Sequence, residues 1–158
     1  MNNSIQIRFA AENDLAQVNL LRKNVNDLHI SGRPEHFKSG FQDVSSLIYQ
    51  IWNSEDQSII VANSNGNICG YACIHRIDKH ETPYTKPMHI YHVEEICVDK
   101  KYRRQGIASC LISFLKQDAK KQGFSRIDLN MWEFNHEALS FYNAVGFQTY
   151  RRHMELIL

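Results

Sequence analysis

The stretch that decides the fold is Glu94-Glu95-Ile96-Cys97-Val98-Asp99-Lys100-Lys101-Tyr102-Arg103-Arg104-Gln105-Gly106-Ile107-Ala108. Its pattern predicts the end of a strand, a short basic loop and the start of a helix. The first turn of a helix has unpaired backbone N–H groups and the positive end of the helix dipole, so it favours a bound anion. Gly106 has no Cβ to keep a phosphate away, and Arg103 and Arg104 add positive charge. The stretch therefore predicts a pyrophosphate-binding loop.

This loop differs from the two common nucleotide-binding motifs. The Lys-Ser/Thr pair of a P-loop does not follow Gly106, and the dinucleotide fingerprint needs more than one glycine. The anion is therefore expected to be held by another kind of phosphate site.

Apolar spacing predicts the elements around the loop. Before it we expect a strand at 5–9, a helix at 14–28, an irregular loop at 29–41, a helix capped by Asp43, and strands at 58–63, 67–77 and 89–98. The first two of those three strands are joined by an Asn65-Gly66 hairpin turn. After the loop we expect a helix from Ile107 to Gly123, a strand at 126–132, a helix from Asn135 to Gly146, and strand-like residues at 147–158. The predicted fold is a mixed α/β sheet flanked by helices.

Length and composition set the class of protein. The 158 residues predict a single domain at 1–158. A net charge of +1 gives no support for a general nucleic-acid or membrane-surface binder. The apolar runs are too short to span a bilayer and the first residues do not form a secretory signal, so we expect a cytoplasmic protein with no membrane partner.

Cysteines and histidines give no sign of a metal centre. The four cysteines form no C-x-x-C pair and sit in apolar patterns, so we expect reduced core residues: Cys69, Cys73, Cys97 and Cys110. The eight histidines are scattered, and we predict no metal site.

Two segments resemble the hallmarks of one family. The basic loop is similar to Arg/Gln-x-x-Gly-x-Gly/Ala, the acetyl-CoA pyrophosphate loop of the GNAT superfamily of N-acetyltransferases, matched by Arg103, Gly106 and Ala108. Residues 135–147 resemble Asn-x-x-Ala-x-x-Phe-Tyr-x-x-x-Gly-Phe, the second hallmark. The resemblance implies a GNAT-like acyl-CoA N-acyltransferase fold. It also implies an acetyl-CoA-dependent N-acetyltransferase in which a primary amine of a small molecule or peptide attacks the thioester directly.

The resemblance also assigns the cofactor site. It places the thioester along the strand at 89–98, near a bulge that splays two parallel strands. A backbone N–H at Ile96 or Cys97 polarises the acetyl carbonyl, and amides around Val98 pair with pantetheine. Asn135 hydrogen-bonds the cofactor, and Tyr142 protonates the departing thiolate. The pyrophosphate is held by Arg103, Arg104, Gln105, Gly106, Ile107, Ala108 and Ser109. We expect Phe141 and Phe147 to pack in the core.

The base that deprotonates the amine has more than one candidate. His92 and Glu94 are two residues apart and share a strand face unless a bulge intervenes, whereas Glu95 faces the other way. His92 is a candidate base because histidine has a suitable pKa for neutral pH. Glu94 is a candidate either as the base, acting directly or through a water, or as a negative charge that binds a cationic substrate. A bulge would change this parity and bring in Glu95.

The acceptor site is expected in the loops at 29–41 and 79–89. Candidate substrate-binding residues are Arg33, His36, Phe37 and Tyr84, together with Glu94. The alternatives are a non-catalytic acyl-CoA-binding sensor or partner module, and an RNA-binding protein using the basic patch at 100–104. The strand-like C-terminus at 151–158 can pair with a second copy, which makes a homodimer possible.

Overall fold

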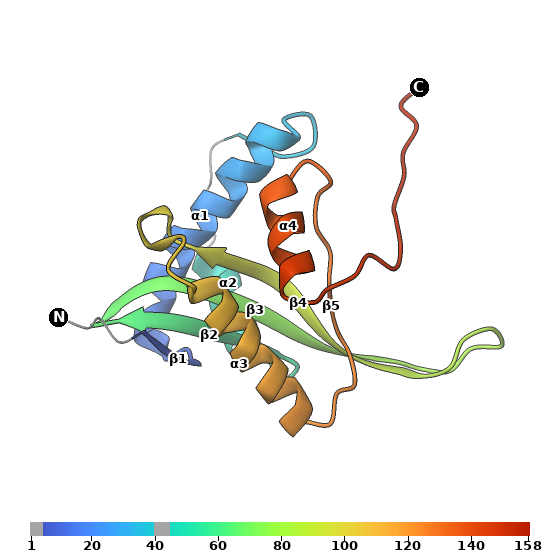
Figure 1. The fold of residues 1–158 in the computed structure, drawn as a ribbon, viewed down its shortest axis with the longest axis horizontal. Helices are drawn as coiled ribbons and strands as arrows, with labels where there is room; N and C mark the ends of the chain where they lie inside the picture. The colour runs from blue at the N-terminus through green and yellow to red at the C-terminus, as the bar shows by residue number, and fades with distance from the viewer. Residues whose placement is uncertain (1–4, 40–44) are drawn as a thin grey trace.

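The computed structural model describes residues 5–39 and 45–158 and shows a single mixed sheet between helices (Figure 1). Five strands form the sheet in the order β1-β2-β3-β4-β5, which is also their order in the chain. Their bounds are β1 Gln6–Phe9, β2 Gln57–Ser64, β3 Asn67–Lys79, β4 Met88–Val98 and β5 Ile127–Leu129. The first four strands pair antiparallel, and β5 runs parallel to β4. The predicted mixed α/β fold is confirmed.

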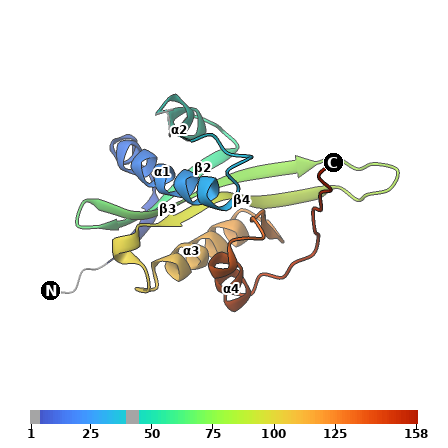
Figure 2. The same cartoon turned by 90° about the horizontal axis from the view of Figure 1, so that it is seen from above.

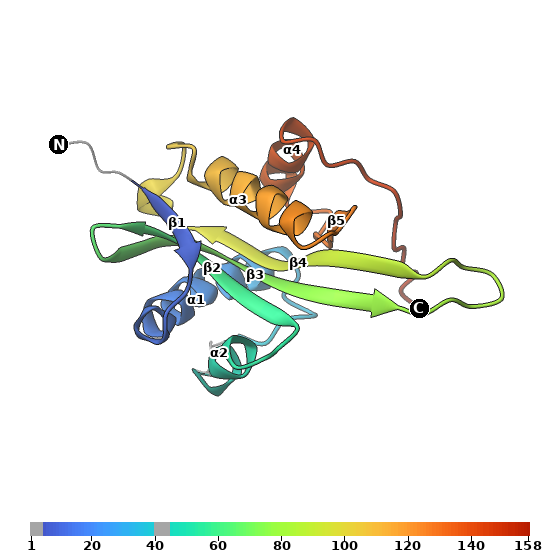
Figure 3. The same ribbon diagram turned by 90° about the horizontal axis from the view of Figure 1, so that it is seen from below.

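The helices lie in two layers. Helices α1 (Leu15–Gly32) and α2 (Ser45–Trp52) cover one face of the sheet, and α3 (Ile107–Lys121) and α4 (His136–Ala144) cover the other (Figures 2 and 3). Single 3₁₀ turns, η1 (Glu12–Asp14) and η2 (Lys100–Tyr102), precede α1 and α3. The long β3–β4 hairpin extends beyond both layers (Figure 1).

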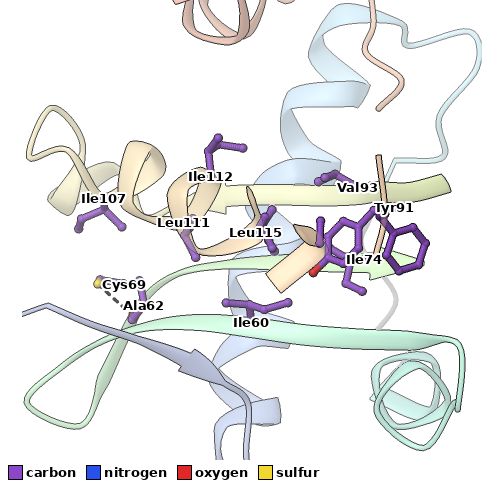
Figure 4. Packing of buried hydrophobic residues seen from close by; sticks show 13 residues of the cluster. Ile60, Ala62, Cys69, Ile74, Tyr91, Val93, Ile107, Leu111, Ile112 and Leu115 are labelled. Atoms are coloured by element: carbon purple, nitrogen blue, oxygen red, sulfur yellow. Dashed lines mark hydrogen bonds between the residues drawn. The ribbon is translucent and has the colours of Figure 1, made fainter. Parts of the chain in front are cut away.

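Because both faces are covered, the central strands are apolar on both sides. In β2, Ile60 and Ala62 pack toward α3, while Ile59 and Val61 pack toward α1 and α2. Figure 4 shows the α3 side, where Leu111 and Leu115 lie over the sheet. This two-sided burial follows from the period of two along a strand.

The Asn65-Gly66 hairpin turn is confirmed. Both residues have positive φ, 51° and 85°, as the two-residue turn requires. The Asp43 helix cap lies outside the described residues, and α1 continues to Gly32, four residues beyond the predicted end.

Three predictions about the core and the C-terminus are wrong. Residues 147–158 form no strand, and the strand predicted at 126–132 contains only Ile127–Leu129. The C-terminal segment runs outward from α4 with no neighbouring strand to pair with (Figure 1). Cys110 is exposed because it lies on the side of α3 opposite the buried stripe, whereas the other three cysteines are buried. Phe141 and Phe147, by contrast, pack against the α3 core as expected, although both are only partly buried.

Within 5–39 and 45–158, the helices are all too short or too polar to cross a bilayer.

A buried carboxylate fixes the start of α1 against the sheet edge. The Arg8 guanidinium on β1 donates to both oxygens of Asp14, at 2.6 and 3.1 Å, and the Ala11 backbone N–H donates at 2.7 Å. The hydrogen bond from Arg8 is the main reason that the pKa of Asp14 lies below its ordinary value of 3.8. A depressed pKa means that this carboxylate stabilises the fold above pH 3.8 and loses that effect as the pH falls through its folded pKa.

We therefore expect Asp14→Asn to lower the free energy of unfolding at pH 7 by about 2 kcal/mol, since a charge-assisted hydrogen bond is lost. The difference from wild type should shrink at pH 3. Urea unfolding at the two pH values measures both effects. Asp27→Asn is the matched control, because the Lys23–Asp27 pair is exposed and should contribute little. A deficit of equal size at both pH values would contradict this account.

Candidate active site

A β-bulge interrupts β4 at Glu94. Val93 lies opposite Ile74 on β3, but Glu95 lies opposite Cys73, so Glu94 is the extra residue. Strand β5 pairs with β4 only at Tyr91, His92 and Val93, directly before the bulge. Among the described residues β5 does not continue along β4 past that point. The two parallel strands therefore part at Glu94, as the family resemblance led us to expect.

The basic loop after β4 leads into α3 with a backbone that can accommodate an anion. Gly106 has φ 78°, a left-handed conformation that glycine adopts at little cost, and it begins α3 without a side-chain cap. Arg104 also has positive φ, 59°, while the Asp99 carboxylate accepts a hydrogen bond from the Lys101 backbone. Arg103, Arg104 and Gln105 are exposed. The first backbone N–H groups of α3 thus face an open, positively charged surface that fits a pyrophosphate.

Helix α4 presents a phenol that stays protonated. The Tyr142 ring contacts those of Phe141 and Phe147, with centroid distances of 5.5 and 5.6 Å. Burial raises the pKa of Tyr142 to about 12. Within the described residues its hydroxyl makes no hydrogen bond, so its proton is available to a ligand. Asn135 caps the helix, its Oδ1 accepting from the Ala138 N–H at 3.1 Å, which leaves the amide NH₂ group to donate elsewhere.

At the bulge, Glu95 is held in an ion pair. The Arg22 guanidinium on α1 donates to its two oxygens at 3.1 and 3.2 Å, and the Tyr71 hydroxyl donates at 2.8 Å. Burial, followed by the charge of Glu95, holds the pKa of Tyr71 well above its usual range, so this proton stays on the phenol. The bulge does turn Glu95 inward, but its oxygens are occupied. Glu94 and His92 are left as the groups able to accept a proton.

His92 and Glu94 lie close together on β4, beside the opening. The Asp128 carboxylate on β5 lies 2.6 Å from Nδ1 of His92, and both side chains are largely buried. A carboxylate there accepts a hydrogen bond, which places the ring proton on Nδ1 and leaves the Nε2 lone pair free. Nε2 lies 3.9 Å from Oε2 of Glu94, which is half-exposed. Asp128 was not predicted from the sequence, because only the β4–β5 register places it directly opposite His92.

A comparison with known families identifies the chain. The family model described as "Acetyltransferase (GNAT) family" matches residues 23–147. The chain belongs to this family. GNAT membership supports acyl transfer from acetyl-CoA to an amine.

Human N-acetyltransferase 8 is 27% identical over 106 residues, 67% of this chain and 45% of that protein. The chain thus spans less than half of this longer relative. Among solved structures, a mutant of the BH1408 protein from Bacillus halodurans superposes with a TM-score of 0.93 at 24% identity, covering 97% of this chain and 99% of that one. The aminoglycoside N-acetyltransferase AAC(6')-Iy in complex with CoA superposes with a TM-score of 0.78 at 17% identity, covering 100% of this chain and 97% of that one. Both structural likenesses show the GNAT fold.

A pocket opens beside Glu94 on the α1–α2 side of the sheet. Its volume is about 320 Å³. Its lining comes from α1, α2, the α2–β2 connection and strands β2, β3 and β4: Arg22, Leu47, Gln50, Ile51, Ser54, Gln57, Cys73, Glu94 and Glu95. Arg22 is paired with Glu95, so Glu94 is the lining carboxylate that faces the space without an arginine partner. Such a pocket suits a cationic amine. Among the described residues, no group of three or more potential ligands could hold a metal.

An aromatic cluster gathers three of the predicted acceptor residues. Phe37 stacks on His29 at 4.9 Å and meets Trp132 edge-on at 5.3 Å, and His36 also contacts Trp132. The Arg33 guanidinium lies 5.4 Å from the Trp132 ring and pairs with Glu35 and Glu155. Trp132 was missed by sequence reasoning because it follows β5, far from the predicted acceptor loops.

Tyr84 does not join this cluster. It lies in the β3–β4 connection and is 96% exposed, and the hairpin carries it beyond the body of the molecule (Figure 1). Its predicted place in the acceptor site is therefore not supported by the fold.

The Arg22–Glu95 pair gives a stability prediction. We expect Arg22→Met to lower the free energy of unfolding by about 2 kcal/mol, because Glu95 keeps its charge in a largely closed site. Adding Glu95→Gln should recover part of the loss, since the neutral amide needs no cation. Chemical unfolding of the two single variants and the double variant measures the coupling.

Lys23→Met is the control for this experiment. Lys23 is the next residue on α1, and its ion pair with Asp27 is exposed. An Arg22→Met variant as stable as Lys23→Met would show that the pair does not hold α1 to β4.

Proposed function

We propose that this GNAT domain transfers an acetyl group from acetyl-CoA to a primary amine by direct attack in a ternary complex. One observation carries the proposal. The bulge at Glu94 parts β4 from β5, with proton-accepting side chains at the opening and the uncapped start of α3 at the end of the same strand. The cationic acceptor, a small amine or a peptide amine, is expected in the pocket beside Glu94.

Each residue of the proposed site has a role in binding or in proton transfer. Arg103 to Ser109 bind the pyrophosphate, chiefly through the backbone of α3, and Asn135 donates a further hydrogen bond. Backbone groups of Ile96, Cys97 and Val98 hold the acyl arm, one N–H polarising the acetyl carbonyl. Glu94 attracts the ammonium, and the Glu94–His92 pair removes its proton. Acetyl-CoA supplies the activated thioester. Tyr142 donates the proton that the departing thiolate needs, and the second proton lost by the attacking nitrogen restores the phenol.

The cofactor assignment predicts a selective effect at Gly106. Calorimetric titration of the wild type should show that acetyl-CoA binds, that CoA competes with it, and that ATP does not. Gly106→Ala should weaken that binding about tenfold or more, because a Cβ strains the φ of 78° and crowds the approaching phosphate. Gly66→Ala is the matched control, since Gly66 has φ 85° in open surroundings at a turn outside the proposed cofactor site. Equal affinity in the two variants would contradict the assignment.

The acid role predicts that Tyr142→Phe lowers kcat about 100-fold while acetyl-CoA affinity is retained. With a pKa of about 12, Tyr142 stays protonated below about pH 10. Replacing it with phenylalanine should therefore lower kcat without changing the shape of the pH dependence of kcat in that range. Thiol release and calorimetry provide the two readouts, and Tyr84→Phe serves as the exposed control. Unchanged turnover would remove Tyr142 as the acid. Acetyl-CoA binding by the wild type without turnover of any amine would favour a non-catalytic acyl-CoA-binding module.

We also propose that two copies associate through the C-terminal segment. Its exposed apolar side chains support this: Tyr150, Met154, Leu156, Ile157 and Leu158 are each at least 71% exposed. Residues 148–158 make no backbone hydrogen bond within the described chain, so the segment can add to the sheet of a partner.

A dimer is therefore expected by light scattering at micromolar concentration. Leu156→Lys with Leu158→Lys should give monomers, because charge is placed in an apolar contact. Leu20→Lys is the control, as Leu20 is a 70% exposed apolar residue on α1. A monomeric wild type would refute the association.

A further inference from the structure

Five titratable side chains form a continuous row across the sheet, and two of them, Glu94 and His92, already have a role in the proposed mechanism. His75 on β3 lies directly opposite His92 on β4, and His92 lies directly opposite Asp128 on β5. Side chains opposite one another on adjacent strands share a face. Asp56, just before β2, extends the row on the far side of His75.

The bulge places Glu94 between the two histidines. Its Oε1 lies 3.3 Å from Nδ1 of His75, and its Oε2 lies 3.9 Å from Nε2 of His92. The other nitrogen of His75, Nε2, lies 3.1 Å from Oδ2 of Asp56. Carboxylate and imidazole therefore alternate from Asp56 through His75, Glu94 and His92 to Asp128.

The row runs from a closed end to an open end. The side chains of His92 and Asp128 are 12% and 14% exposed, whereas that of Asp56 is 58% exposed. Asp56 is fixed there by the Ser54 hydroxyl, and that hydrogen bond, followed by the one from His75, lowers the pKa of its carboxyl. An ionised carboxylate in contact with solvent terminates the row.

The overall reaction releases a proton. An ammonium and acetyl-CoA give an acetamide, free CoA thiol and one proton, so each turnover must deliver a proton to solvent. If Glu94 and His92 take that proton, they must lose it before the next turnover.

We propose that His75 and Asp56 carry this proton from Glu94 to solvent, an inference that rests on the proposed function. His75 takes a proton at Nδ1 from Glu94 and releases the one on Nε2 to water beside Asp56, so no net charge accumulates. The ring then regains its starting tautomer by exchanging protons with solvent before the next turnover. Imidazole suits the step because its two nitrogens exchange roles near neutral pH. His75 is also a positioning residue, since its hydrogen bond fixes Glu94 in the bulge.

The structure offers a matched control on the same hairpin. Asp78 and His89 lie opposite one another on β3 and β4 and form a carboxylate–imidazole contact of the same kind, exposed and away from the opening. Asp78→Asn therefore removes an aspartate–histidine contact without touching the row.

The kinetic test compares Asp56→Asn and His75→Ala with Asp78→Asn. The first two should lower kcat about tenfold with the KM for acetyl-CoA unchanged, and should raise the solvent deuterium isotope effect on kcat. Free imidazole in the buffer should raise the kcat of His75→Ala in proportion to the imidazole concentration, because His75 is partly exposed at the surface. Asp78→Asn should behave as wild type. Wild-type kcat in His75→Ala, or a loss that imidazole does not restore, would overturn the relay.

A second measurement separates the relay from the proposed function. Nitrogen NMR of the histidine rings reports tautomers without turnover. Asp56→Asn should change the ring signals of His75 and also those of His92, whereas Asp78→Asn should change only those of His89. A wild type that acetylates no amine would refute the proposed function, and His92 signals unmoved by Asp56→Asn would refute the relay.

Discussion

The bulge at Glu94 is the constraint on which the site depends. One extra residue in β4 turns Glu94 toward the pocket and Glu95 toward Arg22, so two adjacent carboxylates take different roles. The ion pair between Arg22 and Glu95 ties α1 to β4 two residues beyond Val93, the last residue of β4 that pairs with β5. Helix α1 is thus held against β4 at the same region where β4 separates from β5. In the proposed function, the cofactor arm enters where the edge of β4 is released in this way.

The same strand links the opening to the anion site. β4 ends at Val98, and a short basic loop leads into α3, whose start is left uncapped by Gly106. Charge is distributed in two separate regions, cationic at this loop and anionic at Glu94. A donor carrying phosphates and an acceptor carrying an ammonium are therefore drawn to different sides of the opening. This separation favours transfer between two ligands bound at once.

Much of this arrangement is predictable from local sequence. Gly106 and the arginines before it, the Asn65-Gly66 turn, and the Asn135 cap depend on backbone chemistry within a few residues. Pairs that form across strands are not local: the contacts of His92 with Asp128, and of His75 with Glu94, depend on register and on one extra residue in β4. Trp132 reaches Phe37 only through the fold, and an apolar pattern at 147–158 predicts a strand without naming its partner.

The central claim is that acetyl-CoA lies in the opening that the bulge creates and reaches the start of α3. Backbone amide NMR of the full chain, recorded with and without acetyl-CoA, tests it most directly. The account predicts the largest shifts at Ile96 to Val98 and at Gly106 to Ala108, with little change in α2 or at the tip of the β3–β4 hairpin. Saturable shifts confined to α2 or the hairpin, with Gly106 to Ala108 unmoved, would contradict it.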